Sequence, residues 1–214
     1  MLSILRASAK PLYLAIGAPF IALRIHPLWV TLLGVPFALA CAYAYASHHW
    51  VWALFLFPLT VMWDAIDGTV ARAQGKESNW GNYFETMIDK SLEVVVFIGL
   101  AFVAPIASIA ALGFGLLSSY AKPRVALVII TDNRDWPAIG EHADKTLILS
   151  LGTLLAAFNQ SQAARILTYT LWAIAIIAFL GTLQRMRYAN HLIAEAERKG
   201  TLLPYLTKEE LPEG

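Results

Sequence analysis

Residues 63 to 89 read WDAIDGTVARAQGKESNWGNYFETMID, and this stretch decides how the chain is organised. Two aspartates, Asp64 and Asp67, end one long apolar run, whereas Glu85 and Asp89 begin the next. Residues three or four apart share one face of a helix, so each pair forms an acidic stripe. If the two helices pack as a hairpin, the stripes bring four carboxylates into one small space.

Small residues accompany both stripes. Gly68 and Ala71 each lie one helical turn beyond a member of the first acidic pair, and Gly81 lies one turn before Glu85. Residues of this size let a backbone or a ligand approach closely. Solvated acids at helix ends would account for any one of these carboxylates, but not for two framed pairs. We therefore interpret the stretch as a functional site.

The two acidic pairs are expected at the same depth in a membrane. From an outer boundary near Trp50, the first pair lies about 21 and 26 Å along a helix that rises 1.5 Å per residue. Counting back from Val103 places the second pair about 21 and 27 Å in. In a hydrocarbon core of about 30 Å, both levels lie just inside the opposite face. Carboxylates there are costly unless a cation neutralises them, so four together indicate divalent metal, with Mg²⁺ or Mn²⁺ suited to oxygen ligands.

The composition is that of an integral membrane protein. Of the 214 residues, 58% are hydrophobic and 14% are charged, and the mean hydropathy is +0.58. An ordinary soluble domain has roughly 25% charged residues, so that class is excluded. The net charge is +1 and no basic run is interleaved with aromatic residues, which gives no basis for a nucleic-acid partner. Cys41 stands alone in an apolar segment and is expected to be a small buried residue.

We expect an all-α fold in which an N-terminal amphipathic helix precedes six transmembrane helices. Residues 2–25 mix apolar and basic side chains, and their longest uncharged run is too short to span, so they are predicted to lie at the membrane interface. The predicted spans are residues 27–47, 50–73, 81–104, 106–130, 144–160 and 163–184. The expected divisions are an interfacial segment at 1–26, a transmembrane domain carrying the acidic site at 27–187, and an exposed C-terminal tail at 188–214, helical to Lys199.

The distribution of basic residues predicts the orientation. The chain has 16 Lys and Arg residues, and only Arg165 falls on the side of the short loops. Because basic residues concentrate in cytoplasmic loops, both termini and the acidic site are expected at the cytoplasmic face. The fifth predicted span is free of charge only over residues 146–158, so its first turns, with His142 and Lys145, are expected to line a water-filled cavity.

The acidic stretch resembles the signature of the CDP-alcohol phosphatidyltransferase family. It reads D-x2-D-G-x2-A-R-x8-G-x3-E-x3-D, where the family has D-x2-D-G-x2-A-R-x8-G-x3-D-x3-D. Seven of the eight signature positions are identical, and Glu85 is the departure. Residues 26–34 (HPLWVTLLG) are also similar to the family's entry to its first membrane helix, with Leu28 in place of an asparagine.

The resemblance implies a reaction: an alcohol attacks the phosphorus of a CDP-linked donor, and CMP leaves. It makes this chain an enzyme of phospholipid synthesis, dependent on Mg²⁺ or Mn²⁺, with two ions expected. Asp89 is implied as a metal ligand and as the candidate general base. The implied metal ligands are Asp64, Asp67, Glu85 and Asp89. The implied CDP contacts are Asp67, Gly68, Ala71, Arg72 and Gly81.

A second set of residues concerns the acceptor. Residues 119–124 and 140–145 resemble segments of the phosphatidylinositol-phosphate synthase branch, in which basic residues hold the phosphate of a phosphorylated acceptor. The corresponding candidates are Lys122, Arg124 and Lys145. The expected acceptor is therefore inositol phosphate or glycerol phosphate. The group transferred to it would be a phosphatidyl or archaetidyl group. These cations would also serve as topology signals, and that alternative stays open.

Other functions also stay open. Within the same family, the chain would use a CDP-amino-alcohol with diacylglycerol, or serine as the acceptor. In another class, the acidic cluster would bind a cation for transport, although the almost wholly apolar outer halves of the spans argue against an ion path. The expected partners are the CDP-linked lipid, the polar alcohol and the bilayer, and a second copy of the chain is a candidate.

Overall fold

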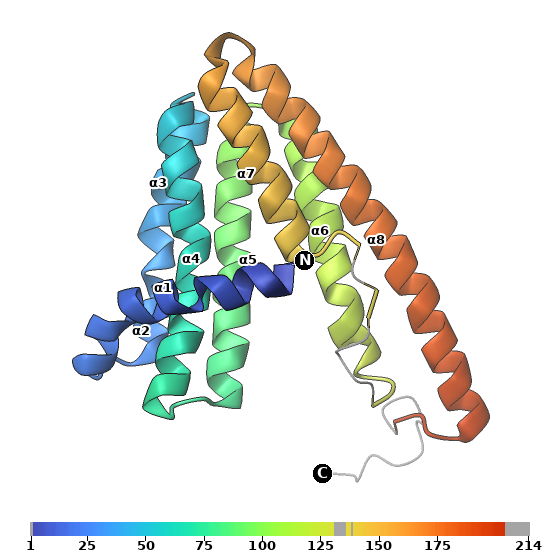
Figure 1. Ribbon diagram of the computed structural model, residues 1–214. Helices are drawn as coiled ribbons and strands as arrows, with labels where there is room; N and C mark the ends of the chain where they lie inside the picture. The colour runs from blue at the N-terminus through green and yellow to red at the C-terminus, as the bar shows by residue number, and fades with distance from the viewer. Residues whose placement is uncertain (1, 131–135, 138, 204–214) are drawn as a thin grey trace, which may run out of the picture.

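The computed structural model describes residues 2–130, 136–137 and 139–203, and these ranges are built from helices (Figure 1). The all-α expectation is confirmed for them. The helices are α1 (Leu2–Ala22), α2 (Pro27–Leu32), α3 (Gly34–Ala46), α4 (Trp50–Gln74), α5 (Asn79–Ala101), α6 (Pro105–Val125), α7 (His142–Phe158), the 3₁₀ turn η1 (Gln160–Gln162) and α8 (Ala163–Lys199).

The first predicted span forms two helices, because the chain breaks at Leu33 between α2 and α3. Pro36 explains the break. A proline has no N–H to donate, and its ring clashes with the carbonyl four residues earlier, here that of Leu32. The other five predicted spans each fall on one helix, although α6 ends at Val125 rather than at 130 and α8 continues past 184 to Lys199.

The helices alternate in direction, so the short connections gather at one end of the bundle. Figure 1 shows the links between α3 and α4, between α5 and α6, and between α7 and α8 at the top of the view. The turn between the two acidic helices, α4 and α5, lies at the opposite end. The short connections therefore lie on one side, as expected from the sequence.

α4 and α5 do not form a closely packed hairpin, since they share few direct contacts. Instead α3 packs on both of them. It approaches α5 so closely that a Cβ atom on Gly99 would lie 2.3 Å from the carbonyl oxygen of Ala42. Space remains between α4 and α5 at the level of their acidic residues, where α2 and α7 border it.

Among the described residues, three helical stretches are long and apolar enough to cross a membrane: Pro27–Ala46, Trp50–Gln74 and Gln160–Lys199. α5 and α6 have 23 and 21 residues, which is also a spanning length. The count of six spans therefore stays a prediction. α1 crosses the bundle and packs on α4 (Figure 1), but its place at a membrane interface is likewise still a prediction.

α8 continues without a break across residues 187 and 188, where the tail was expected to begin, and ends at Lys199 as predicted. Its last turns pack against the end of α6. The cluster comprises Val125, Val128, Ile129, Trp136 and Ala196, with Tyr188, Leu192, Ile193 and Leu202 around it. This part of the tail is therefore a packed element, and residues 204–214 lie outside the described residues.

Candidate active site

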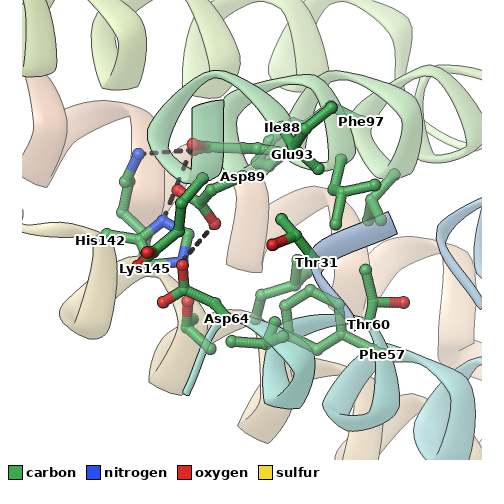
Figure 2. Close-up of a pocket in the computed structure, with 16 residues that line it drawn as sticks. Thr31, Phe57, Thr60, Asp64, Ile88, Asp89, Glu93, Phe97, His142 and Lys145 are labelled. Carbon is green, nitrogen blue, oxygen red and sulfur yellow. Dashed lines mark hydrogen bonds and ion pairs between the residues drawn. The ribbon is translucent and has the colours of Figure 1, made fainter. Parts of the chain in front are cut away.

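Two adjoining cavities lie at the acidic stretch, and both are lined by Thr31 of α2 and Glu85 of α5. The polar residues of the first cavity include Asp64, Asp89, Glu93, His142 and Lys145 (Figure 2). Its opposite wall is apolar and includes Phe57, Val61, Leu92, Val96, Phe97 and Leu149. The second cavity is lined by Asp67, Gly68, Ala71, Arg72 and Gly81, together with residues 26–28, residues 76–78, Trp80 and Asn82.

The structure brings all four predicted carboxylates to these cavities. Asp64 and Asp89 line the first, Asp67 lines the second, and Glu85 lines both. Glu85 interacts electrostatically with Asp64 and with Asp89. Asp67 interacts in the same way with Asp64 and Glu85. The two acidic stripes therefore share one electrostatic environment, although their helices do not pack directly.

Asp67 is deeply buried, with 2% of its surface exposed. Within the described part of the chain, neither of its carboxylate oxygens accepts a hydrogen bond. The Thr31 hydroxyl lies close enough to interact with Asp67, but its hydrogen bond of good geometry goes to the carbonyl oxygen of Pro27 at 3.3 Å. A buried carboxylate without a donor is costly, so a cation fits this position.

The donor set supports the same conclusion, because carboxylate oxygens are the ligands that Mg²⁺ and Mn²⁺ prefer. Among residues 2–130, 136–137 and 139–203, no three Asp, Glu, His or Cys side chains are gathered closely enough to form a ready-made metal cage. The fit to a divalent metal thus rests on the carboxylate donors and on the burial of Asp67, and not on a preformed cage.

Helix ends position the second cavity. α4 ends at Gly75, whose φ of 62° is left-handed, and α5 begins after Ser78, whose Oγ accepts the N–H of Gly81 at 3.0 Å. The side chain of Arg72 lies over Gly68, where a Cβ atom would be 3.3 Å from the Arg72 Nη1 atom. The predicted nucleotide contacts thus surround one cavity, and Gly68 leaves room for a guanidinium group.

Gln74 ties the N-terminal segment to the same end of α4. Its Nε2 atom donates to the carbonyl oxygens of Phe20 and Ile25 at 3.2 and 3.0 Å. These carbonyls flank the end of α1, where helical hydrogen bonding stops. These two hydrogen bonds hold the α1–α2 connection beside the second cavity, which His26 and Leu28 help to line.

The three predicted phosphate ligands do not all line the two cavities. Of the three, only Lys145 lines either of the two cavities. Lys122 and Arg124 lie in the last turn of α6, half-buried and exposed respectively. The Nζ atom of Lys145 donates to Glu93 Oε1 at 2.6 Å, with both side chains almost fully buried.

Glu93 is a residue of the cavity that the sequence reasoning missed. Gly81, Glu85 and Asp89 recur every four residues, and Glu93 continues this stripe by one more turn. Its Oε2 atom accepts a hydrogen bond from Lys90 Nζ at 3.0 Å. The periodicity would have placed Glu93 on the correct face, but the identity of its partners depends on the tertiary structure.

Arg185 of α8, also missed, holds the chain before α7. It is 5% exposed, and it donates to the carbonyl oxygens of Ser118 at 2.7 Å and Pro137 at 3.3 Å. Its Nη2 atom lies 3.5 Å from Glu141 Oε1. Glu141 caps α7 in a reciprocal capping box with Asp144. Arg185 therefore fixes the first turn of α7, which carries His142 and Lys145 into the first cavity.

Comparisons with known proteins identify relatives of the chain. The sequence profile of the CDP-alcohol phosphatidyltransferase family matches residues 24–183. A phosphatidylinositol phosphate synthase of Streptomyces avermitilis is 26% identical over 91% of this chain and 86% of the relative. An archaetidylinositol phosphate synthase of Pyrococcus horikoshii is 30% identical over 47% of this chain and 54% of the relative.

Solved structures share the fold. The crystal structure of Mycobacterium tuberculosis phosphatidylinositol phosphate synthase (PgsA1) with CDP-DAG bound superposes with a TM-score of 0.72, at 20% identity, over 93% of this chain and 98% of that chain. The same protein in complex with manganese and citrate gives a TM-score of 0.69, at 19% identity, over 94% and 95% of the two chains.

Proposed function

Because the chain belongs to the CDP-alcohol phosphatidyltransferase family, and is thereby a phosphotransferase, we propose that it moves a phosphatidyl or archaetidyl group from a CDP-linked lipid to a phosphorylated polar alcohol and releases CMP. One observation carries this proposal: the carboxylates of the family signature line two cavities that meet at Thr31 and Glu85. A polar cavity and a partly apolar one would hold the two ends of a nucleotide-linked lipid.

The second cavity is the proposed nucleotide site. Arg72 offers a planar pair of donors to a phosphate, and Gly68 keeps the space in which the guanidinium group lies. The apolar wall of the first cavity suits the lipid part of the donor. The bound CDP-DAG in the Mycobacterium tuberculosis relative supports a lipid donor of this class.

The proposed metal ligands are Asp64, Asp67, Glu85 and Asp89, which would hold Mg²⁺ or Mn²⁺. When bound, such ions neutralise the charge that develops on the diphosphate. Asp89 has a further role, because it lines the first cavity, where it would accept the proton of the attacking hydroxyl. The alcohol oxygen then forms the new bond to the lipid-bearing phosphorus as the bond to the CMP oxygen breaks.

The proposed acceptor is inositol phosphate or a related phosphorylated alcohol, as the names of the bacterial and archaeal relatives suggest. Since Lys145 is paired with Glu93, Lys122 and Arg124 are the predicted cations that remain for the phosphate. Six membrane spans with the site at the cytoplasmic face, and a homodimer, belong to the same proposal.

The test is CMP release by the purified protein with CDP-diacylglycerol, or its archaeal ether analogue, and Mg²⁺ or Mn²⁺. Inositol phosphate, glycerol phosphate, free inositol and serine are offered in turn. We expect release with a phosphorylated alcohol. Preference for serine or free inositol would exclude the phosphorylated acceptor. Turnover of a CDP-amino-alcohol with diacylglycerol instead would show that the donor and acceptor are reversed.

A further inference from the structure

Three basic side chains surround the Glu93 carboxylate, and two of them are hydrogen-bonded to it. Lys145 Nζ lies 2.6 Å from Oε1, Lys90 Nζ lies 3.0 Å from Oε2, and His142 Nδ1 lies 3.7 Å from Oε2. The side chains of Glu93 and Lys145 are only 7% and 5% exposed, so little water screens the contact between these two. Figure 2 shows Glu93 beside Asp89, with His142 and Lys145 facing both from α7.

Asp89 competes for two of the same groups. Lys90 Nζ is 3.3 Å from Asp89 Oδ2, and His142 Nε2 is 3.7 Å from Asp89 Oδ1. The Lys90 ammonium group is thus closer to Glu93 than to Asp89. Without Glu93, the strongest remaining partner of Lys90 would be Asp89, its neighbour in sequence.

We propose that Glu93 is a positioning residue for Asp89, which keeps Lys90 from closing over the Asp89 carboxylate. Lys90 lies 3.3 Å from Asp89 Oδ2 but is shared with the nearer Glu93, so Asp89 is less tightly paired than it would be alone and can bind a metal ion or receive a proton in the first cavity. A carboxylate in a tight ion pair with an ammonium group does neither well, because its lone pairs are occupied. This inference rests on the proposed function, in which Asp89 is a ligand of the divalent ion.

Mn²⁺ affinity tests the inference without requiring turnover. In full-length, detergent-purified protein titrated with Mn²⁺ and followed by electron paramagnetic resonance, Glu93→Gln should weaken binding about tenfold, as changes around a metal ligand commonly do. Adding Lys90→Met should restore the affinity, because it removes the group that closes on Asp89. Glu93→Asp keeps the charge and should retain most of the affinity.

The matched control is Glu93→Gln combined with Lys145→Met. It has the same formal charge as Glu93→Gln with Lys90→Met, but Lys145 pairs with Glu93 rather than with Asp89. The inference requires that Lys90→Met restores Mn²⁺ binding and that Lys145→Met does not. Equal restoration by both would mean that overall charge alone sets the affinity and would overturn the inference.

The Glu93→Gln variant could also fail to fold, since it leaves Lys145 buried without its counterion. If that variant does not fold, the Mn²⁺ affinity of the Glu93→Gln, Lys145→Met double variant is compared with that of the triple variant that also carries Lys90→Met. The inference requires tighter binding by the triple variant. Glu195→Gln, which breaks the ion pair with Lys199 on the surface of α8, should leave binding unchanged. Wild-type affinity in Glu93→Gln would overturn the role of Glu93 alone. A wild-type protein that binds no Mn²⁺ would overturn both this inference and the proposed metal site.

Discussion

A Cβ atom on Gly115 of α6 would lie 2.7 Å from the ammonium nitrogen of Lys145 on α7 and 3.6 Å from Glu93 Oε1 on α5. Gly115 therefore leaves the space that the buried ion pair occupies where three helices meet. We expect Gly115→Val to displace the ammonium group from Glu93 and to cost about 1–3 kcal/mol of stability through overpacking. Thermal unfolding in detergent measures this. Gly113→Val is the control, since a Cβ atom at Gly113 has no neighbour within 4 Å, and equal losses would contradict the prediction.

Removing charge at Asp67 or Asp89 should abolish metal-dependent CMP release while the protein stays folded. Asp67 is buried and no donor of good hydrogen-bond geometry reaches its oxygens in the described structure, so Asp67→Asn chiefly removes the attraction for a cation. Asp89→Asn also removes the proton acceptor, which is worth about a hundredfold or more in rate. CMP release and size-exclusion profiles are measured together, with Glu197→Gln on the exposed end of α8 as the control. Undiminished release by either variant would refute its assigned role.

Glu85 lines both cavities, and its two conservative substitutions should separate charge from length. Glu85→Asp restores the family residue and keeps the negative charge, so activity should be retained with an altered preference between Mg²⁺ and Mn²⁺. Glu85→Gln keeps the length but loses the charge, so most activity should be lost. The rate of CMP release in each metal is the measurement. A fully active Glu85→Gln variant would mean that this carboxylate is no ligand.

Gly68→Ala should weaken nucleotide binding through Arg72. The added Cβ atom would lie 3.3 Å from Arg72 Nη1, so the guanidinium group must move away from its place over the helix. We expect a KM for the CDP-lipid several-fold higher, with a smaller effect on the KM for the acceptor. Gly113→Ala on α6 serves as the control for the extra methyl group. An unchanged KM for the CDP-lipid would mean that the space at Gly68 is not needed for Arg72 to bind the nucleotide.

Arg124→Ala tests the predicted phosphate site. If Arg124 binds the phosphate of the acceptor, its loss should raise the KM for the acceptor about tenfold, since a charge-assisted hydrogen bond is lost. The KM for the CDP-lipid should hardly change. Arg198→Ala, which removes another exposed arginine, from the end of α8, should change neither value. An unchanged acceptor KM in Arg124→Ala would leave Arg124 as a topology signal only.

Much of the fold follows from local sequence features. Long apolar runs fixed the place of five helices, and the break of the first span at Leu33 was also readable from Pro36, four residues past Leu32. The separation of α4 from α5 could not be predicted from the sequence, because it depends on the packing of α3 against both helices. Contacts of that kind come from the summed shape of many side chains.

The candidate site, too, was predictable from the sequence only in part. The carboxylates came from spacing within one stretch, and extending the four-residue repeat by one turn would have added Glu93. The pairing of Glu93 with Lys145 joins residues 52 positions apart, and Arg185 reaches Glu141 across 44 positions. No local period encodes such pairs, so the burial of Lys145 against Glu93 could be seen only in the structure, and its role as a phosphate ligand stays a prediction.

The length of α8 has a practical consequence for imaging. Its 37 residues extend about 55 Å at 1.5 Å per residue, well beyond a hydrocarbon core of about 30 Å. Its last turns are braced against α6 by the cluster around Trp136 and Ala196, so they do not swing freely. A chain of 23.5 kDa offers little mass for particle alignment in electron cryomicroscopy. A rigid fiducial domain attached near the end of α8, with Leu202 kept in place against the cluster, would lie far from both cavities.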